Sequence, residues 1–293
     1  SVDLVMVATS GSVGLLPTLT ALKSQKQVAL SNKEPIVMAG KILKEYEAKY
    51  GGVILPVDSE PSAIWQCIRG ETGQVKKLII TASGGPFRNT AISQLDSVTP
   101  EEALKHPTWS MGKKITIDSS TMMNKAFEVI ESKWLFDMDW DDIEVMIHPQ
   151  STVHSMVEFI DGSVKAQLGP PNMRLPIQYA LFYPDRISNT NIPRLSTTTG
   201  YSLEFQPLNV DRYPCYRIAL ESARLEGTYP TVISAADEIA VEAFLNKRIK
   251  YTRIPEIIES VISQHSNIHN PVLEDILDSE RWATSTARTL IGN

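Results

Sequence analysis

Apolar residues in the first 60 positions form short buried runs that alternate with longer segments of helical period. The short runs predict β-strands and the longer segments predict helices. In chain order, these strands and helices are expected at residues 2–8, 14–24, 27–32, 33–51 and 53–60. This β-α-β-α-β order predicts a parallel sheet with right-handed crossovers.

The pattern changes between residues 61 and 190, where strands and helices no longer alternate regularly. We expect helices at residues 63–70 and 121–136, strands at residues 75–85 and 113–120, and two or three strands within residues 143–169. The closely spaced strands in the last segment, with a turn at Asp161-Gly162, predict a sheet that is partly antiparallel.

Residues 191–214 carry little pattern and three prolines, which is typical of a linker. Four amphipathic segments follow and predict a small helical bundle. They cover residues 216–227, 232–248, 254–265 and 272–292. The expected fold class is therefore α/β: a partial Rossmann-type parallel sheet, a central α/β domain and a C-terminal helical bundle.

The parallel sheet has only half of the strands of a complete dinucleotide-binding fold. The segment Gly-Ser-Val-Gly at residues 11–14 follows its first strand. This segment is either a weak phosphate-binding signal or simply a tight turn between strand and helix.

Composition excludes several classes of function. The net charge is −6 and the isoelectric point is about 5.5, so we expect no nucleic-acid partner. No apolar run has the roughly 18–20 residues that a membrane-spanning helix needs, so we expect no membrane partner. The two cysteines, Cys67 and Cys215, form neither a metal-binding spacing nor a disulfide framework.

Two acids, Asp58 and Glu60, end the third predicted strand. Ligands of open parallel sheets bind beyond the carboxyl ends of the strands, and alternate residues of a strand face one side. Both carboxylates can therefore point at one divalent cation, which prefers oxygen ligands. The alternative is a pair of ordinary surface acids.

A second polar group lies around the start of the helix expected at residues 121–136. Asn124 and Glu128 are four residues apart and share a helix face, beside Lys125. Asp118, Ser119, Ser120 and Thr121 precede them and are typical capping residues. This arrangement indicates a phosphate site with a carboxylate one turn on, or else a solvated helix face.

Two loops add further candidates. Ser83 stands with Gly84 and Gly85 at a strand end, either close to a ligand or in a plain turn. The segment at residues 105–114 contains His106, Trp109, Met111 and Gly112. Such a loop is typical of a lid that excludes water. The alternative is that Trp109 anchors the loop on the core.

Seven motifs occur together in this order: SNKE, VDSE, SGGPF, HPTWSMG, DSSTMMNKAFE, HPQSTVHSM and DGSVKAQLG. In this the chain closely resembles the 1-deoxy-D-xylulose 5-phosphate reductoisomerases of the non-mevalonate isoprenoid pathway. The resemblance implies conversion of 1-deoxy-D-xylulose 5-phosphate, a phosphosugar, to 2-C-methyl-D-erythritol 4-phosphate. It also implies two cofactors, NADPH and a divalent cation (Mn²⁺, Mg²⁺ or Co²⁺).

The resemblance also implies roles for individual residues. The expected metal ligands are Asp58, Glu60 and Glu128, which with Lys33 are also the expected catalytic residues. The expected substrate-binding residues are Lys33, Ser59, Glu60, Ser83, His106, Ser119, Asn124, Lys125 and Glu128. The expected lid residues are His106, Trp109 and Met111, and the expected cofactor contacts are Asn32, Glu34 and Gly112.

Two departures from the family pattern stand out. Pro61 occupies the position after the Asp-Ser-Glu motif where the family usually has His. The family's upstream strand and glycine-rich turn have no counterpart here, which predicts an N-terminally truncated chain that lacks the first half of the NADPH-binding domain. Such a chain is expected to use NADPH poorly. The alternatives are a metal- and phosphosugar-binding module without turnover and, less compatible with the motif order, another metal-dependent phosphosugar isomerase.

The resemblance finally suggests a domain plan and an environment. Residues 1–57 are expected to form the second half of the NADPH-binding domain and residues 58–192 the catalytic domain. Residues 193–213 are the linker and residues 214–293 the C-terminal helical domain. Strands within residues 143–168 are expected to build a homodimer interface. The expected location is the bacterial cytoplasm, or a plastid-type organelle if a targeting segment has been removed.

Overall fold

The computed structural model describes residues 2–196, 198 and 200–292. Internal packing divides the chain into two compact units. Unit 1 consists of Ser1–Ile36, Leu43–Ser83 and Glu131–Leu208. Unit 2 consists of Val37–Ile42, Gly84–Ile130 and Asn209–Asn293.

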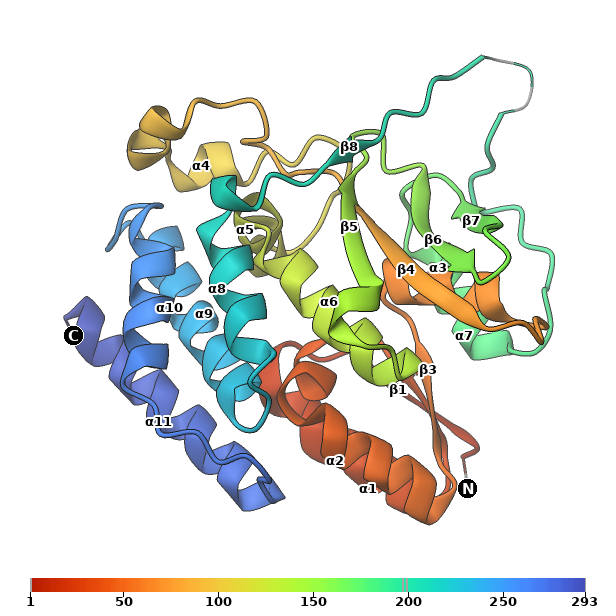
Figure 1. Ribbon diagram of the computed structural model, residues 1–293, viewed down its shortest axis with the longest axis horizontal. Coiled ribbons are helices and arrows are strands. Elements are labelled where there is room, and N and C mark those ends of the chain that lie inside the picture. Colours follow the sequence, from red (N-terminus) through yellow and green to blue (C-terminus); the bar gives the residue numbers. More distant parts are fainter. Residues whose placement is uncertain (1, 197, 199, 293) are drawn as a thin grey trace. The chain divides into compact units, whose positions relative to one another are not determined.

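Unit 1 begins with the predicted three-stranded sheet, whose strands are parallel and lie in the order β1-β2-β3 (Figure 1). Its strands are β1 (Leu4–Val7), β2 (Gln27–Leu30) and β3 (Val53–Pro56). In register, Val28 of β2 lies between Val5 and Ile54. The β-α-β-α-β prediction for the first 60 residues is therefore confirmed, and the carboxyl ends of all three strands meet at one edge.

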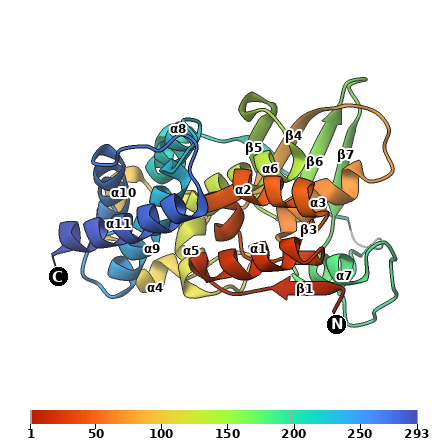
Figure 2. The ribbon, with the colours of Figure 1, turned by 90° about the horizontal axis from the view of Figure 1, so that it is seen from below.

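Glycines make the connections of this sheet possible. The 3₁₀ turn η1 (Gly11–Gly14) leads into α1 (Leu15–Lys23), which lies alongside β1 in Figure 2. The next helix, α2 (Glu34–Tyr50), ends at Gly51, whose φ of 81° is left-handed. A Cβ on Gly52 would lie 2.8 Å from the Leu22 backbone, so a larger residue there would push α1 away.

A second, five-stranded sheet in unit 1 has the order β7-β6-β4-β5-β8. Its strands are β4 (Val75–Ala82), β5 (Ile143–Ile147), β6 (Val153–Phe159), β7 (Val164–Leu168) and β8 (Gln206–Pro207). Only the β4–β5 pairing is parallel, so the expectation of a partly antiparallel sheet is confirmed. The 3₁₀ turn η3 (Trp140–Asp142) precedes β5.

Two helices pack in unit 1 around a small aromatic cluster. Helix α3 (Ser59–Ile68) contacts β6 and β7 and also α7 (Arg174–Phe182). Trp65 of α3 lies 4.6 Å, between ring centroids, from both Tyr179 and Tyr183. Because aromatic side chains bury large apolar areas, this cluster fixes the start of α3, where two candidate metal ligands lie.

Unit 2 is built mainly from helices. Its elements are η2 (Ile92–Ser97), α4 (Pro100–Ala103), α5 (Lys113–Thr121), η4 (Val210–Arg212), α8 (Pro214–Ala223), α9 (Tyr229–Leu245), α10 (Arg253–Ser263) and α11 (Leu273–Ile291). Helix α9 is buried along nearly its whole length and contacts α5, α8, α10 and α11 (Figure 1). A helix that is apolar over most of its surface belongs at the centre of a bundle, as α9 does here. The predicted C-terminal helices are therefore confirmed.

One strand prediction is wrong. Residues 113–120, expected as a strand because of β-branched Ile115 and Ile117, form the helix α5. Two interactions one turn apart support this helix. The Thr116 hydroxyl donates to the Gly112 carbonyl at 2.7 Å, and Lys114 pairs with Asp118. Packing of α5 on α8 and α9 then overrides the local preference.

Helix α6 (Met123–Phe136), whose residues are divided between the two units after Ile130, starts directly after α5. Met122 has a left-handed φ of 62° and separates the two helices. Among the described residues, no helix is both long and apolar enough to cross a membrane.

Candidate functional site

The Asp-Ser-Glu motif lies at the start of a helix and not at the end of a strand. Strand β3 already ends at Pro56, and Asp58 is the N-cap of α3. The Asp58 carboxylate accepts a hydrogen bond from the Ser59 backbone N–H at 3.0 Å. The expectation that strand alternation aligns Asp58 and Glu60 is therefore wrong. Asp is a favoured N-cap, and Pro61 suits a first helical turn because it needs no N–H there.

Helical geometry nevertheless keeps this motif compact. The Ser59 hydroxyl donates to the Glu60 carboxylate at 2.6 Å, and Asp58 is only 7% exposed. A carboxylate in such a place needs a cationic partner, since burial of an unpaired charge is unfavourable. Lys33 supplies one: its ammonium lies 2.9 Å from the Asp58 carboxylate and is itself buried.

Lys33 reaches Asp58 because strands β2 and β3 are neighbours and end at the same edge. Asn32, just before it, donates to the Gly11 carbonyl at 3.0 Å and to Glu34 at 3.3 Å. A Cβ on Gly14 would lie 2.9–3.1 Å from the side chains of Thr9 and Asn32. The polar stretches that follow all three strands are thus gathered at one edge of unit 1.

Unit 2 holds the second group of candidates at the start of α6. Asn124 donates from its amide to Glu128, and Lys125 forms an ion pair with the same carboxylate. Lys125 is 4% and Glu128 is 1% exposed. The helix spacing expected for these three side chains is therefore present. A carboxylate so deeply buried is uncommon without a functional or structural reason.

The four residues read as caps of this helix lie elsewhere. Asp118, Ser119, Ser120 and Thr121 belong to the last turns of α5, and α6 begins after them. Of the four, Thr121 contacts the start of α6, where its hydroxyl accepts from the Met123 backbone N–H at 3.3 Å. The capping role predicted for the other three is wrong, because the left-handed Met122 makes the break between the helices. Ser119 remains within unit 2, near the loop that follows α4.

That loop, residues 104–112, carries the predicted lid residues. The Nδ1 atom of His106 accepts hydrogen bonds from the backbone N–H groups of Thr108 at 3.2 Å and Trp109 at 2.9 Å. A neutral imidazole with Nδ1 as acceptor carries its proton on Nε2. Nε2 lies 3.1 Å from the Ser119 hydroxyl and therefore donates to it.

The protonation state of His106 follows from its surroundings. Burial, with a smaller contribution from the positive charge of Lys125, lowers the pKa of His106 to about 4. The imidazole is therefore neutral at physiological pH and acts as a hydrogen-bond donor, not as a cation. Ser119 accepts from it and keeps its own hydroxyl proton available for a ligand.

The remaining candidates lie at the ends of elements. Ser83 directly follows β4 and is half-buried. Gly112 is the N-cap of α5, one residue after the half-buried Met111. A Cβ on Gly85, with a φ of 70°, would lie 2.6 Å from the Ser119 carbonyl oxygen, so only glycine fits beside α5.

Sequence reasoning missed one charged cluster in unit 2. Lys114 lies 2.6 Å from Asp118 and 2.7 Å from Asp237 of α9, and both acids are buried. Two signals were available. Lys114 and Asp118 have the i, i+4 spacing of helical ion pairs, and Asp237 stands among the apolar residues of a helix whose pattern predicts burial. The cluster ties the base of the lid loop to the helical bundle.

Comparison with protein families gives three matches along the chain. The model described as 1-deoxy-D-xylulose 5-phosphate reductoisomerase matches residues 1–40. The model of its C-terminal domain matches residues 54–136, and a further model of the DXP reductoisomerase C-terminal domain matches residues 168–286.

Individual proteins agree with these matches. The 1-deoxy-D-xylulose 5-phosphate reductoisomerase of Desulforamulus reducens is 50% identical over 290 residues, covering 99% of this chain and 75% of the relative. The Bacillus subtilis enzyme is 52% identical over 281 residues, covering 96% and 73%. The chain thus spans about three quarters of the length of these relatives.

Solved structures are also similar. The Zymomonas mobilis reductoisomerase in complex with NADPH has a TM-score of 0.91 and 41% identity, covering 99% of this chain and 76% of that one. A DOX-P reductoisomerase in complex with NADPH, fosmidomycin and magnesium gives the same TM-score, identity and coverage.

Proposed function

The chain belongs to the 1-deoxy-D-xylulose 5-phosphate reductoisomerase family, and from this premise we propose that it converts 1-deoxy-D-xylulose 5-phosphate to 2-C-methyl-D-erythritol 4-phosphate. The reaction is a metal-assisted rearrangement followed by reduction with NADPH, in isoprenoid biosynthesis. The observation that carries this proposal is the 50% identity along 99% of the chain.

The proposed metal ligands are Asp58 and Glu60 of unit 1 and Glu128 of unit 2. Carboxylate oxygens are the donors that Mg²⁺, Mn²⁺ and other hard divalent cations prefer. The buried positions of Asp58 and Glu128 are compatible with this role, because a buried carboxylate needs positive charge beside it. A lysine supplies such a charge to each carboxylate in this structure. When bound, the cation supplies positive charge that polarises the substrate's carbonyl and hydroxyl oxygens.

Lys33 and Ser59 act beside this metal group. The buried ammonium of Lys33 orients the Asp58 carboxylate and places a second positive charge near the substrate oxygens. The Ser59 hydroxyl holds the Glu60 carboxylate in one orientation. We assign both residues to substrate binding as well, and Lys33 to charge stabilisation during the rearrangement.

The phosphate group of the substrate is proposed to bind at the start of α6. Asn124 and Lys125 lie in the first turn of this helix, where backbone N–H groups and the helix dipole favour anions. The Ser119 hydroxyl, which accepts from neutral His106, is free to donate its proton to a phosphate oxygen. We propose that Ser83 adds a second hydroxyl.

The loop at residues 104–112 is proposed to act as the lid. The His106 imidazole organises this loop, because it accepts hydrogen bonds from two of the loop's backbone N–H groups. Trp109 and Met111 supply apolar surface that excludes water from the substrate. NADPH supplies the hydride, and Asn32, Glu34 and Gly112 are the proposed cofactor contacts.

Turnover tests this proposal directly. The chain is incubated with 1-deoxy-D-xylulose 5-phosphate, NADPH and Mg²⁺, and the decrease in NADPH absorbance is followed. We expect substrate-dependent oxidation of NADPH at a low rate, in keeping with the poor use of NADPH expected from the sequence. Glu60→Gln should reduce this rate together with the affinity for the cation. Tight binding of the phosphosugar and cation without any NADPH oxidation would support a binding module and contradict the proposal.

We also propose that the enzyme is a homodimer paired through the segment at residues 143–168. Strand β7 lies at the edge of its sheet, so one side of its backbone has no strand partner within that sheet. Its Val164 is 50% exposed, and Ile160 just before it is 64% exposed. Val164→Lys should shift the molar mass measured by light scattering from dimer to monomer. An unchanged mass would place the interface elsewhere.

Because the relatives are bacterial enzymes, we propose a cytoplasmic location.

A further inference from the structure

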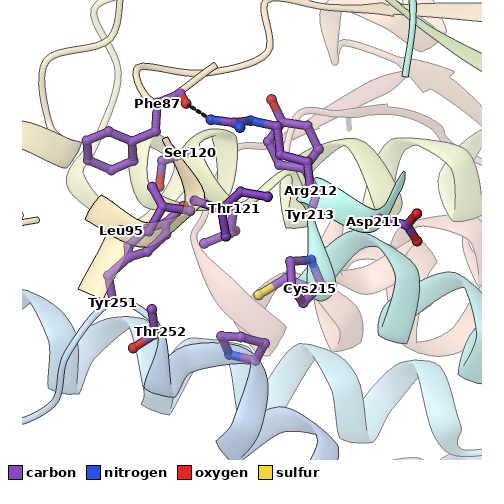
Figure 3. A pocket seen from close by; sticks show the side chains of 13 residues that line it. Phe87, Leu95, Ser120, Thr121, Asp211, Arg212, Tyr213, Cys215, Tyr251 and Thr252 are labelled. Atoms are coloured by element: carbon purple, nitrogen blue, oxygen red, sulfur yellow. Dashed lines mark hydrogen bonds between the residues drawn. The ribbon is translucent and has the colours of Figure 1, made fainter. Parts of the chain in front are cut away.

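We propose that unit 2 contains a second binding site, separate from the phosphosugar residues, that takes a neutral apolar molecule about the size of benzene. The site is a cavity of about 140 Å³. It lies among the end of α5, the loop after β4, η2, η4 and the starts of α8 and α10. Figure 3 shows the side chains that line it.

The walls of this cavity are mainly apolar and aromatic. The rings of Phe87 and Tyr251 meet edge to face, with centroids 5.3 Å apart. Pro255 contributes aliphatic surface. Leu95 does so too, and Cys215 contributes its sulfur atom (Figure 3). Phe87, Tyr251 and Cys215 are each less than 9% exposed, so the deeper wall is firmly packed.

The hydroxyl groups of the wall are already satisfied by the protein. Ser120 donates to the Ile117 carbonyl at 2.6 Å, and Thr252 donates to the Asp96 carboxylate at 2.8 Å. Tyr213 donates to the Gly84 carbonyl at 3.1 Å. Because these groups have partners outside the cavity, a ligand gains little from polar atoms of its own.

The charge of the wall favours a neutral ligand as well. Burial raises the pKa of the Cys215 thiol well above its ordinary value, and burial likewise raises the pKa of Tyr251. Both groups are therefore uncharged at neutral pH. The guanidinium of Arg212 donates to the carbonyls of Phe87 and Thr90, and the Asp211 carboxylate points away from the other labelled side chains (Figure 3).

Size identifies the class of ligand. An apolar protein cavity of about 150 Å³ stays dry and binds benzene or xenon. The present cavity has nearly this volume and is lined mainly by apolar surface, with Ser120, Thr121, Asp211, Arg212 and Thr252 also at its border. A single aromatic ring or a branched hydrocarbon chain of similar size therefore fits, whereas a sugar phosphate has neither the size nor the charge for it.

The test uses benzene as the probe and the full chain as the protein. Binding is measured by saturation-transfer NMR, with benzoate as a charged probe that has the same ring. We expect a saturable benzene signal and at least about tenfold weaker binding of benzoate, since its carboxylate would lose hydration among mainly apolar side chains. The Arg212 guanidinium at the wall already donates to the Phe87 and Thr90 carbonyls. Absence of saturable benzene binding, or tighter binding of benzoate, would overturn the proposal.

Cavity-filling variants locate the site. Cys215→Met extends a side chain into the cavity and should weaken benzene binding about tenfold to hundredfold, because the ligand then meets an overpacked wall. Cys67→Met is the matched control, since Cys67 is the other buried cysteine and lies in unit 1. It should leave benzene binding unchanged.

A second filling variant keeps the test decisive if Cys215→Met does not fold. Leu95 lies on the partly exposed side of the cavity, where Leu95→Trp perturbs the core less. It should weaken benzene binding to a similar degree. Retention of full benzene affinity in a folded filling variant would show that the probe binds elsewhere and would refute the assignment.

Discussion

The cluster of Lys114, Asp118 and Asp237, whose two acids are buried and whose lysine side chain is 31% exposed, makes the sharpest stability prediction. In Lys114→Met the aliphatic part of the side chain is kept and the charge is lost. The ammonium of Lys114 lies 2.6 Å from Asp118 and 2.7 Å from Asp237, whose side chains are 4% and 0% exposed. The substitution therefore leaves two carboxylates buried without the cation that lies between them.

The expected magnitude follows from this burial. Removal of one partner from a buried ion pair destabilises a protein by about 3–5 kcal/mol, because the remaining charge stays desolvated. The free energy of unfolding of a typical domain is about 5–15 kcal/mol. We therefore expect Lys114→Met to lower the urea midpoint of unit 2 strongly, as followed by circular dichroism at neutral pH.

An exposed ion pair in the same unit is the matched control. Lys250 pairs with Asp96, but their side chains are 66% and 54% exposed. Lys250→Met should change the free energy of unfolding by less than about 1 kcal/mol. In addition, Asp237→Asn combined with Lys114→Met should recover part of the loss, since one buried charge is removed. Equal effects of Lys114→Met and Lys250→Met would refute this reasoning.

Two further predictions concern Gly85 and His106 of unit 2. Gly85→Ala should destabilise the protein more than Gly70→Ala. Both have a left-handed φ, worth about 1–2 kcal/mol, but only at Gly85 does the new Cβ meet a backbone atom, at 2.6 Å. Equal urea midpoints for the two variants would contradict the close contact. In an NMR titration His106 should stay neutral until the pH approaches its pKa of about 4. Between this value and the ordinary 6.5 the unfolded chain binds more protons than the folded one, so the His106 contribution makes stability rise with pH in that range. Protonation of folded His106 near pH 6.5 would show that its ring is solvated.

The sequence predicted most elements correctly where one local signal decided them. The three parallel strands of unit 1 have short apolar runs, and Gly51 marks the end of α2. The predicted turn at Asp161-Gly162 lies between β6 and β7, and Gly162 has a left-handed φ of 85° there. Such signals act within a few residues, so they can be recognised before the fold is known.

Errors arose where packing or a single backbone angle decided the outcome. Ile115 and Ile117 favour a strand locally, yet contacts with α8 and α9 make the segment helical. The left-handed Met122 separates α5 from α6, and no periodicity in the sequence announces it. Asp58 was placed on a strand because the apolar run before it concealed the N-cap. The motif residues were nevertheless found, because their identity and order carry the family resemblance.

The domain boundaries proposed at residues 57, 192 and 213 remain predictions. The two compact units are defined by internal packing and not by the order of elements along the chain. Residues 37–42 of α2 therefore belong to unit 2, although the rest of this helix belongs to unit 1. Chain segments that pack together need not be continuous, and a linear pattern of strands and helices does not contain this information.

The proposed metal group is the centre of this account, and one measurement tests it most directly. Crystals of the chain grown with Mn²⁺ and fosmidomycin are measured at the manganese absorption edge. We predict one strong anomalous peak at about 2.0–2.3 Å from carboxylate oxygens of Asp58, Glu60 and Glu128. A manganese peak bound to other residues, with these three carboxylates turned away from it, would contradict the account.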